Sequence, residues 1–430
     1  MALEVTRSGK GNAARRARAL ALALAAAALA ASGAPAGARA AELAPGERRV
    51  LVQSRSGHEI HVSAPALATA ADGAPLLAWI RFDADGRHVY AQRAGADGGP
   101  PVRVDPPGLE VDAIHQAPGL AVGPRGEVYV TWSSKPAAAP AGALFASDLQ
   151  LSRSLDGGRS FEAPLRVNEA RAVSHSFEGI AASADGALAV AWIDSREGWA
   201  HPGTYVARVV ERGSRVEGRV AVGSDTCPCC RVAAAAGPGA ALALAWRQTF
   251  AGNVRDFVFA GSRDGGRSFA PSRRVAVDGW ALDACPHRGG ALALDASGRA
   301  WLAWYSEGDD ATPRLRLAFA EPGAPFGAPR ALHEDPRSLP DHVALAVAGD
   351  GRGLVAFEAA TAVRSAVVLR LVDGAGGEIG PPLLPAKSVV AKSPAVAAAG
   401  DGFTAAWIEE EFPEVRFVVQ ELRVRAPVTR

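Results

Sequence analysis

The four cysteines of the chain lie in two short segments, residues 225–230 and 283–287, and the second segment also carries a histidine. Thiolate sulfur and imidazole nitrogen are the ligands that copper and zinc favour in proteins. Their concentration at two places in a chain of 430 residues indicates a metal site. The expected core of this site consists of Cys227, Cys229, Cys230, Cys285 and His287.

Disulfide formation is the competing interpretation of the same cysteines. Cysteines of exported proteins often form disulfides. A bond from Cys285 to Cys230, or to Cys227, would link the two segments. A bond within residues 227–230 would close a strained ring, because a disulfide needs a defined separation of its two Cα atoms. The sequence leaves both a metal site and a disulfide open.

An internal repeat organises most of the chain. Each repeat unit contains a short apolar strand, a turn with glycine, a second strand that ends in an aromatic residue, and one or two further strands. The aromatic residues recur at intervals of 50 to 60 residues and are Trp79, Trp132, Trp192, Trp246, Trp304, Phe357 and Trp407. Four short antiparallel strands at this period are typical of a β-propeller blade, because radial stacking buries both faces of each small sheet.

The expected fold is therefore an all-β propeller of four-stranded antiparallel blades. Seven repeat units are visible, so we predict seven blades, with six as the alternative if one unit is misassigned. The last unit, which ends at residues 417–424, lacks an obvious fourth strand, and a strand at residues 49–53 precedes the first complete unit. We expect this N-terminal strand to close the ring, with residues 41–430 as a single domain.

The repeat also gives several histidines and one cysteine a common position. Counting five residues back from the first large apolar residue of the predicted inner strand reaches a potential metal ligand in four consecutive units. The pairs are Leu120 with His115, Ile180 with His175, Val232 with Cys227, and Leu292 with His287. Equivalent positions of a propeller surround one end of its central channel, where ligands usually bind. We therefore expect His115 and His175 to be outer members of the metal site.

Two repeat units carry a sharper motif, Ser-x-Asp-x-Gly-x-x-aromatic, at residues 154–161 and 262–269. The defining residues are Ser154, Asp156, Gly158 and Phe161 in the first copy and Ser262, Asp264, Gly266 and Phe269 in the second. The aspartate can accept backbone N–H bonds of its own turn, and glycine permits a positive φ. The motif resembles the Asp-box, or BNR repeat, of the sialidase-like propeller superfamily. That resemblance implies a structural turn between the third and fourth strands of a blade.

The resemblance also implies what a catalytic member would need. In such members an arginine triad binds the substrate carboxylate, and a Tyr–Glu pair supplies the nucleophile for glycoside hydrolysis. The Arg-Ile-Pro signature of the superfamily is absent here, and no tyrosine follows Tyr305, which stands beside Trp304 in a predicted strand. We therefore expect a binding or metal-site module. A sialidase-type glycoside hydrolase with a diverged site, and a protein-interaction scaffold with a structural disulfide, are the alternatives.

Residues 1–40 have the features of a cleaved secretory signal. Arg15, Arg16 and Arg18 precede an uninterrupted apolar stretch at residues 19–31, and residues 38–40 offer a small-x-small cleavage pattern. The apolar stretch is shorter than the roughly 20 residues of a membrane-spanning helix. We therefore expect export to the periplasm or the extracellular space. In that compartment, copper is favoured over zinc at a site rich in thiolate and imidazole.

The charge balance narrows the range of partners. The chain has 46 Lys and Arg against 45 Asp and Glu, a net charge of +1 at pH 7, and its basic residues are dispersed among acidic ones. Nucleic-acid binding is therefore not expected. No second apolar stretch reaches membrane length, so we expect no membrane span after signal cleavage. A small ligand, a glycan or a protein at the channel mouth is the expected kind of partner.

Overall fold

The computed structural model describes residues 41–55, 62–95, 98–112, 117–136, 143, 145–386 and 389–425, with the side chains of residues 52–55 left aside. Residues Glu42–Arg425 form one compact unit. Within the described residues the regular structure is β-strand, apart from the short 3₁₀ helix η1 (Ala251–Asn253). None of this helical structure has the length and hydropathy of a membrane span. The predicted signal, residues 1–40, lies outside the described residues.

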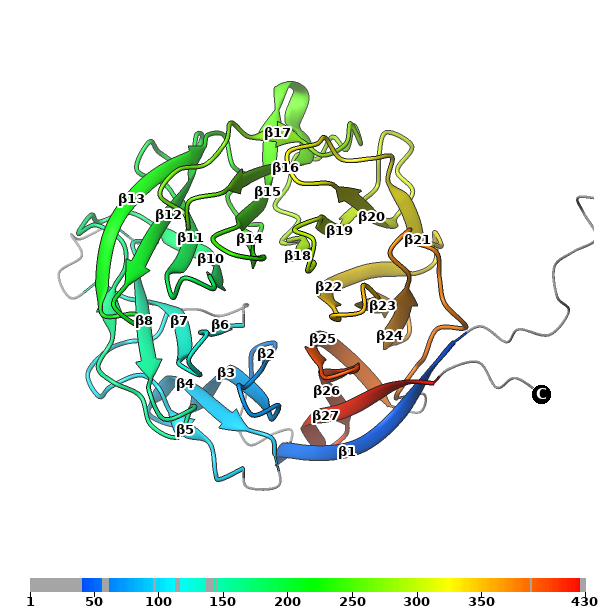
Figure 1. Cartoon of the computed structure of the whole chain (residues 1–430), viewed down its shortest axis with the longest axis horizontal. Coiled ribbons are helices and arrows are strands. Elements are labelled where there is room, and N and C mark those ends of the chain that lie inside the picture. The colour runs from blue at the N-terminus through cyan, green and yellow to red at the C-terminus, as the bar shows by residue number, and fades with distance from the viewer. Residues whose placement is uncertain are drawn as a thin grey trace, which may run out of the picture. The chain divides into compact units, whose positions relative to one another are not determined.

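The strands of the described chain form seven small antiparallel sheets that are arranged as the blades of a ring (Figure 1). Blade one consists of β2 (Ala66–Thr69), β3 (Pro75–Asp83), β4 (Gly86–Arg93) and β5 (Val102–Arg103). Blade two consists of β6 (Gly119–Val122), β7 (Val128–Ser134), β8 (Asp148–Ser154) and β9 (Leu165–Arg166). Blade three consists of β10 (His175–Ala182), β11 (Leu188–Asp194), β12 (Gly203–Val210) and β13 (Arg215–Gly223). Blade four consists of β14 (Ala233–Ala236), β15 (Leu242–Phe250), β16 (Val254–Ser262) and β17 (Arg273–Arg274). Blade five consists of β18 (Ala291–Leu294), β19 (Ala300–Ser306), β20 (Arg314–Ala320) and β21 (Arg330–Glu334). Blade six consists of β22 (Leu339–Val347), β23 (Gly353–Ala360) and β24 (Ser365–Val372). Blade seven consists of β25 (Val390–Ala399), β26 (Gly402–Glu411), β27 (Glu414–Arg425) and β1 (Glu42–Arg55). The outer segment of blade six pairs with β24 through isolated bridges at Leu383 and Glu378.

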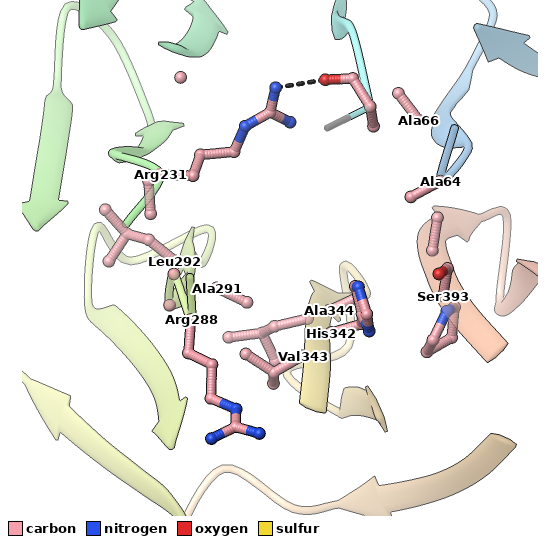
Figure 2. Close-up of a pocket in the computed structure, with 18 of the residues that line it drawn as sticks. Ala64, Ala66, Arg231, Arg288, Ala291, Leu292, His342, Val343, Ala344 and Ser393 are labelled. Carbon is pink, nitrogen blue, oxygen red and sulfur yellow. Dashed lines mark hydrogen bonds between the residues drawn. The ribbon is translucent and has the colours of Figure 1, made fainter. Parts of the chain in front are cut away.

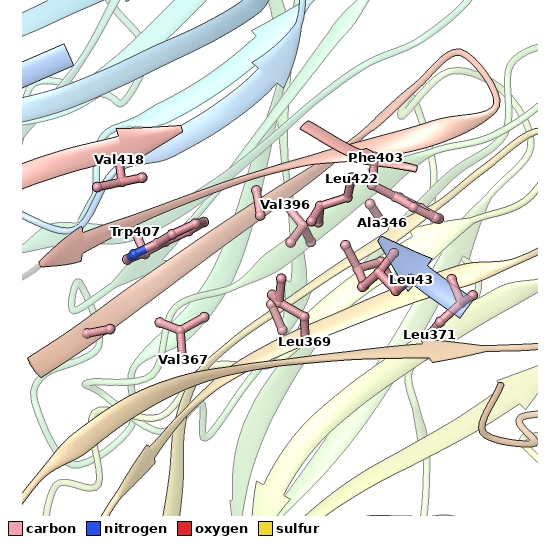
Figure 3. Packing of buried hydrophobic residues seen from close by; sticks show 14 of the residues in the cluster. Leu43, Ala346, Val367, Leu369, Leu371, Val396, Phe403, Trp407, Val418 and Leu422 are labelled. Atoms are coloured by element: carbon pink, nitrogen blue, oxygen red, sulfur yellow. The ribbon is translucent and has the colours of Figure 1, made fainter. Parts of the chain in front are cut away.

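The N-terminal strand closes the ring, as the sequence predicts. β1 pairs antiparallel with β27, with Leu43 opposite Val424 and Val50 opposite Val418. Leu43 is 6% exposed and belongs to the hydrophobic cluster between blades six and seven, which also contains Trp407 (Figure 3). β1 therefore completes blade seven, and the predicted seven-bladed architecture is confirmed.

Buried aromatic residues join each blade to the blade before it. Seven hydrophobic clusters of the described residues each combine side chains of two neighbouring blades. The seven repeat aromatics are all 0% exposed, and each lies in a different one of these clusters. Burial of a large aromatic side chain is worth several kcal/mol, about 3–5 on truncation to alanine. The period seen in the sequence is thus the period of the interfaces between blades.

The two Asp-boxes form the turns that the resemblance implies. The first lies between β8 and β9, where the N–H of Gly158 donates to Ser154 Oγ at 2.8 Å and the N–H of Ser160 donates to Asp156 Oδ1 at 3.0 Å. The second, between β16 and β17, repeats these contacts at 2.9 and 3.0 Å. Phe161 and Phe269 pack against clusters between blades. The boxes therefore fix the hairpins that lead from the third to the fourth strand in blades two and four.

Candidate metal centre

The two cysteine segments end at neighbouring inner strands, β14 in blade four and β18 in blade five. The first segment is attached to the second strand of its own blade, because the N–H of Cys227 donates to the carbonyl oxygen of Arg247 at 2.8 Å. Farther along, the N–H of Val232 donates to the carbonyl oxygen of Phe177 in blade three at 3.0 Å. Backbone hydrogen bonds from two blades therefore hold the cysteines in place.

A glycine allows blade three to lie this close to the first segment. A Cβ atom at Gly179 in β10 would come 2.2 Å from the carbonyl oxygen of Val232, so a larger residue would push the two apart. The Phe177 ring packs against the cysteines from the same side. Its backbone has a φ of 58°, in the left-handed region that non-glycine residues rarely adopt. This backbone conformation places the apolar ring of Phe177 against the cysteines.

Cys227, Cys229 and Cys230 form what we call the inner group, and their sulfur atoms all lie within 4.8 Å of one another. Cys227 Sγ is 3.8 Å from Cys229 Sγ and 3.5 Å from Cys230 Sγ. Two sulfurs that bind the same ion at about 2.3 Å are roughly 3.8 Å apart in a tetrahedral site and roughly 4.0 Å apart in a trigonal site, so the observed spacings are close to what a shared ion requires.

The predicted disulfide alternative is not present in the structure. All four cysteines are free thiols. The sulfur separations within the inner group are far longer than an S–S bond of about 2.05 Å. Cys230 lies against Cys227 rather than bonding to Cys285, because the second segment meets the first at Cys229 instead.

Cys229, Cys285 and His287 form what we call the outer group, whose ligand atoms also lie within 4.8 Å of one another. Cys285 and His287 are exposed, whereas Cys229 is only 5% exposed. Cys229 belongs to both groups. The five residues predicted as the core of a metal site therefore come together from two blades.

Two buried arginines border the inner group. Arg255 Nη1 donates to Cys227 Sγ at 3.1 Å, and Arg255 Nε donates to the carbonyl oxygen of Leu282 at 3.2 Å. Arg247 is 0% exposed and donates to the carbonyl oxygens of Arg255 and Tyr305 at 2.7 and 2.8 Å. Neither arginine forms an ion pair with a carboxylate of the described residues. Because a buried charge is costly unless it is compensated, this arrangement favours ionised sulfur beside the arginines.

The thiols of the inner group differ in acidity. Contacts with the Cys229 and Cys230 sulfurs, followed by the Arg255 charge, hold the pKa of Cys227 well below its usual range. Burial raises the pKa of Cys230, against the opposing charge of Arg247. Cys227 is therefore the more acidic of these two thiols.

The predicted register needs a correction in blade four. Ala234 of β14 occupies the place that Leu292 has in β18, since each pairs with the residue two positions before the aromatic of the next strand. The equivalent residue is therefore Ala234 and not Val232. Counting five residues back reaches Cys229 rather than Cys227. Cys229 is thus the positional counterpart of the histidine in the outer group.

His175 has the predicted position but lies apart from the metal-ligand groups found among the described residues. β10 begins at this residue, and the side chain is fully buried. Its Nδ1 lies 2.5 Å from the carbonyl oxygen of Ser147 and 3.1 Å from the Asn168 amide, and its Nε2 lies 3.5 Å from Asp194. His115 falls outside the described residues, so its part in the site stays a prediction.

The candidate metal centre borders a central pocket of about 750 Å³ that is lined by the starts of the inner strands of all seven blades. Cys229 and His287 belong to the pocket wall. Figure 2 shows Arg231 extending from the start of β14, with His342 and Ser393 on the other side of the pocket. The outer group can therefore be reached from the channel.

The charged side chains of the pocket are largely paired. Arg231 Nη2 lies 3.6 Å from Glu178 Oε1, and Arg288 Nε lies 3.3 Å from Asp341 Oδ2. Burial raises the pKa of Glu178, against the charge of Arg231. The second imidazole of the pocket is also paired, because His342 Nδ1 lies 3.1 Å from Glu358 Oε2, so Cys229 and His287 are the pocket residues that belong to a potential metal-ligand group.

Tyr305 is a packing residue, as the sequence predicts. It is 2% exposed, its ring packs edge-on against Trp280, and its hydroxyl donates to Glu307 at 2.6 Å. Burial, followed by the bond to Glu307, raises the pKa of Tyr305. A nucleophilic phenol needs a lowered pKa, so this environment works against the role that the superfamily gives to its tyrosine.

A third group of potential ligands lies in the turn between β3 and β4. The ligand atoms of Asp83, Asp85 and His88 are within 4.8 Å of one another, and His88 Nδ1 lies 3.0 Å from Asp105 Oδ2. However, both carboxylate oxygens of Asp83 accept hydrogen bonds from Arg81, at 2.6 and 2.9 Å. We therefore treat this turn as a control site in metal measurements.

Sequence reasoning missed the two arginines of the centre. Arg247 directly follows the repeat aromatic Trp246 and the apolar first half of its strand, which is an available signal for a buried cation. The register of the two cysteine segments also had a signal in the sequence. Both segments contain the pattern Asp-x-Cys-Pro, at residues 225–228 and 283–286, and alignment of the two patterns places Cys229 opposite His287.

Comparison with known proteins places the fold. No protein-family model matches the chain. No curated protein sequence matches it either. Among solved structures, a protein of unknown function from Dyadobacter fermentans is 12% identical with a TM-score of 0.54, over 89% of this chain and 99% of that one. An ulvan lyase is 10% identical with a TM-score of 0.55, over 85% of this chain and 95% of that one.

A fungal alcohol oxidase solved in complex with copper is also similar, at 12% identity and a TM-score of 0.52, over 89% of this chain and 77% of that one. Similarities at this level of identity show the fold alone. The fold is that of a seven-bladed β-propeller. The chemistry of the site has to be argued from its own residues.

Proposed function

We propose that this protein is a propeller that binds a soft metal ion at its Cys/His centre, with monovalent copper favoured over zinc. The observation that carries the proposal is the convergence of five thiol and imidazole groups from two blades, with sulfur spacings of 3.5 and 3.8 Å that suit one ion. Thiolate-rich sites favour monovalent copper and zinc over hard cations.

The surrounding charges support copper. Three thiolates and one monovalent ion leave two negative charges, which the guanidinium groups of Arg247 and Arg255 can offset. Three thiolates and one divalent ion would leave one net positive charge on the inner group and the two buried arginines together. Because uncompensated buried charge is costly, the inner group suits a monovalent ion better.

The position of the centre supports a role in holding the ion where another molecule can reach it. The inner group is buried beneath Phe177, whereas Cys285 and His287 are exposed and His287 lines the central pocket. A small ligand or a partner protein could approach through that pocket. The predicted export of the chain would place such a centre outside the cytoplasm.

Metal analysis of the purified full chain tests the proposal. We expect stoichiometric copper after anaerobic loading with Cu(I), competed against a Cu(I)-specific chelator, and a strong loss of copper in Cys227→Ser and in Cys229→Ser. His88→Ala, in the β3–β4 turn, is the matched control and should bind as the unaltered protein does. Absence of stoichiometric copper or zinc in the folded, fully reduced protein would refute the proposal.

A further inference from the structure

We infer that Cys229 bridges two monovalent soft metal ions, one in the inner group and one in the outer group. This inference rests on the proposed function and adds its stoichiometry and its bridging atom. Each group supplies three ligand atoms within 4.8 Å of one another, and Cys229 is the residue they share. Three ligands are a complete set for a monovalent copper ion, and a thiolate sulfur has enough lone pairs to bind two ions.

One ion cannot use all five residues equally well. The inner sulfurs are grouped around Cys227, which lies 3.8 Å from Cys229 and 3.5 Å from Cys230. Cys285 and His287 share a ligand group with Cys229 but with neither of the other two cysteines. The centre is therefore divided into two sets of three that meet at a single sulfur atom.

The charges of the whole centre also favour two ions. Four thiolates carry four negative charges, two monovalent ions offset two of them, and Arg247 and Arg255 offset the other two. Both arginines are at least nine-tenths buried, and neither has a carboxylate partner among the described residues. With one monovalent ion and four thiolates, one negative charge would be left over at the edge of the buried centre, at a cost in stability.

The two positions differ in exposure, so the two ions should differ in exchange rate. The inner group is buried, with Cys227 and Cys230 at 0% exposure, and Phe177 packs against it. The outer group has two exposed ligands next to the channel pocket. A chelator approaching from solvent would meet the outer ion first.

Anaerobic titration of the full reduced chain with Cu(I) alone tests this inference. We expect two ions per chain, a metal–metal scattering path in X-ray absorption, and removal by a chelator in two phases. Cys230→Ser and His287→Ala should each reduce the stoichiometry to one ion and abolish the metal–metal path. Cys229→Ser should weaken both positions together.

Two controls separate the possible results. His88→Ala should leave two ions bound, which excludes the β3–β4 turn as the second position. Binding of one ion by the unaltered chain, with an equal loss in all the Cys and His variants of the centre, would overturn the bridge but keep the proposed function. Binding of no ion would overturn both.

Discussion

Replacement of Arg255 by methionine should weaken Cu(I) binding without removing a single metal ligand. The guanidinium donates to Cys227 Sγ at 3.1 Å in a buried setting. A hydrogen bond to a charged group contributes about 1.5–3 kcal/mol. The metal-free protein can adapt to the loss by protonating a thiol, whereas the metal-bound centre cannot, so the loss falls mainly on the bound state.

At 1.4 kcal/mol for each factor of ten, the affinity for Cu(I) should fall by roughly 10- to 150-fold. Competition with a Cu(I)-specific chelator at neutral pH measures this change. Arg273→Met is a suitable control, because Arg273 is in the same blade but donates to the carbonyl oxygen of Gly323, away from the cysteines. Arg255→Lys should bind more tightly than Arg255→Met, since it retains the charge.

Equal Cu(I) affinity in the unaltered protein and in Arg255→Met, with all four thiols free and the same thermal unfolding midpoint, would refute this reasoning. The arginine would then be a packing residue that ties Leu282 to the cysteine segment, and the sulfurs would be neutral thiols. An equal loss in Arg273→Met would also refute it, because the effect would then come from the net charge of the chain.

Other predictions concern the cysteines and the fold. Thiol counting on denatured, unreduced protein should find four free thiols, and a lower number would indicate a disulfide. Trp192→Ala should cost about 3–5 kcal/mol in urea unfolding, because the side chain is 0% exposed between two blades. Deletion of residues 42–55 should lower the thermal midpoint sharply, since it removes the strand that closes the ring. Hydrogen bonds from Ser268 lower the pKa of Asp264 to about 2, below its usual value; the resulting stabilisation is present above about pH 4 and is lost as the pH falls towards 2. Asp264→Asn should therefore unfold more easily at pH 7 and show a smaller loss of stability between pH 4 and pH 2 in denaturant titrations.

The fold was predictable because few residue types can do what its repeat requires. A buried interface between two blades needs a large aromatic residue at one place in each second strand, and the seven positions from Trp79 to Trp407 meet that need. The Asp-boxes were predictable for a similar reason, because the turn is built from the motif's own side chains. Both signals are local in sequence and repeat at a fixed period.

Only the part of the site that depends on residue type, its set of thiol and imidazole side chains, was predictable from the sequence. The sequence indicated the five residues that the structure brings together, but the register failed in blade four because the inner strand there is four alanines, and its first residues offer no large side chain to count from. His175 was placed by the same count. It lies elsewhere because β10 extends back to it and directs its ring towards blade two.

The sequence around Arg247 signals a buried cation, but the proximity of the two arginines to sulfur depends on packing that no local pattern reveals. Arg247 and Arg255 stand in β15 and β16, where a sequence pattern indicates only an irregular strand. Their proximity to sulfur follows from the path of residues 225–230 across the end of β15. That path is fixed by the backbone bond from Cys227 to the carbonyl oxygen of Arg247.

The propeller separates the residues that build the ring from those that can bind a metal. The aromatics of the second strands are constrained by both neighbouring blades, so they keep one residue type around nearly the whole ring. The segments that enter the inner strands face the channel, and they can differ from blade to blade without loss of an interface. In blades four and five these segments carry Cys229 and His287 at equivalent positions, each two residues after a cysteine. Adjacent blades bring equivalent positions close together, so the same short segment placed in two neighbouring blades is sufficient to assemble a site whose ligands come from both.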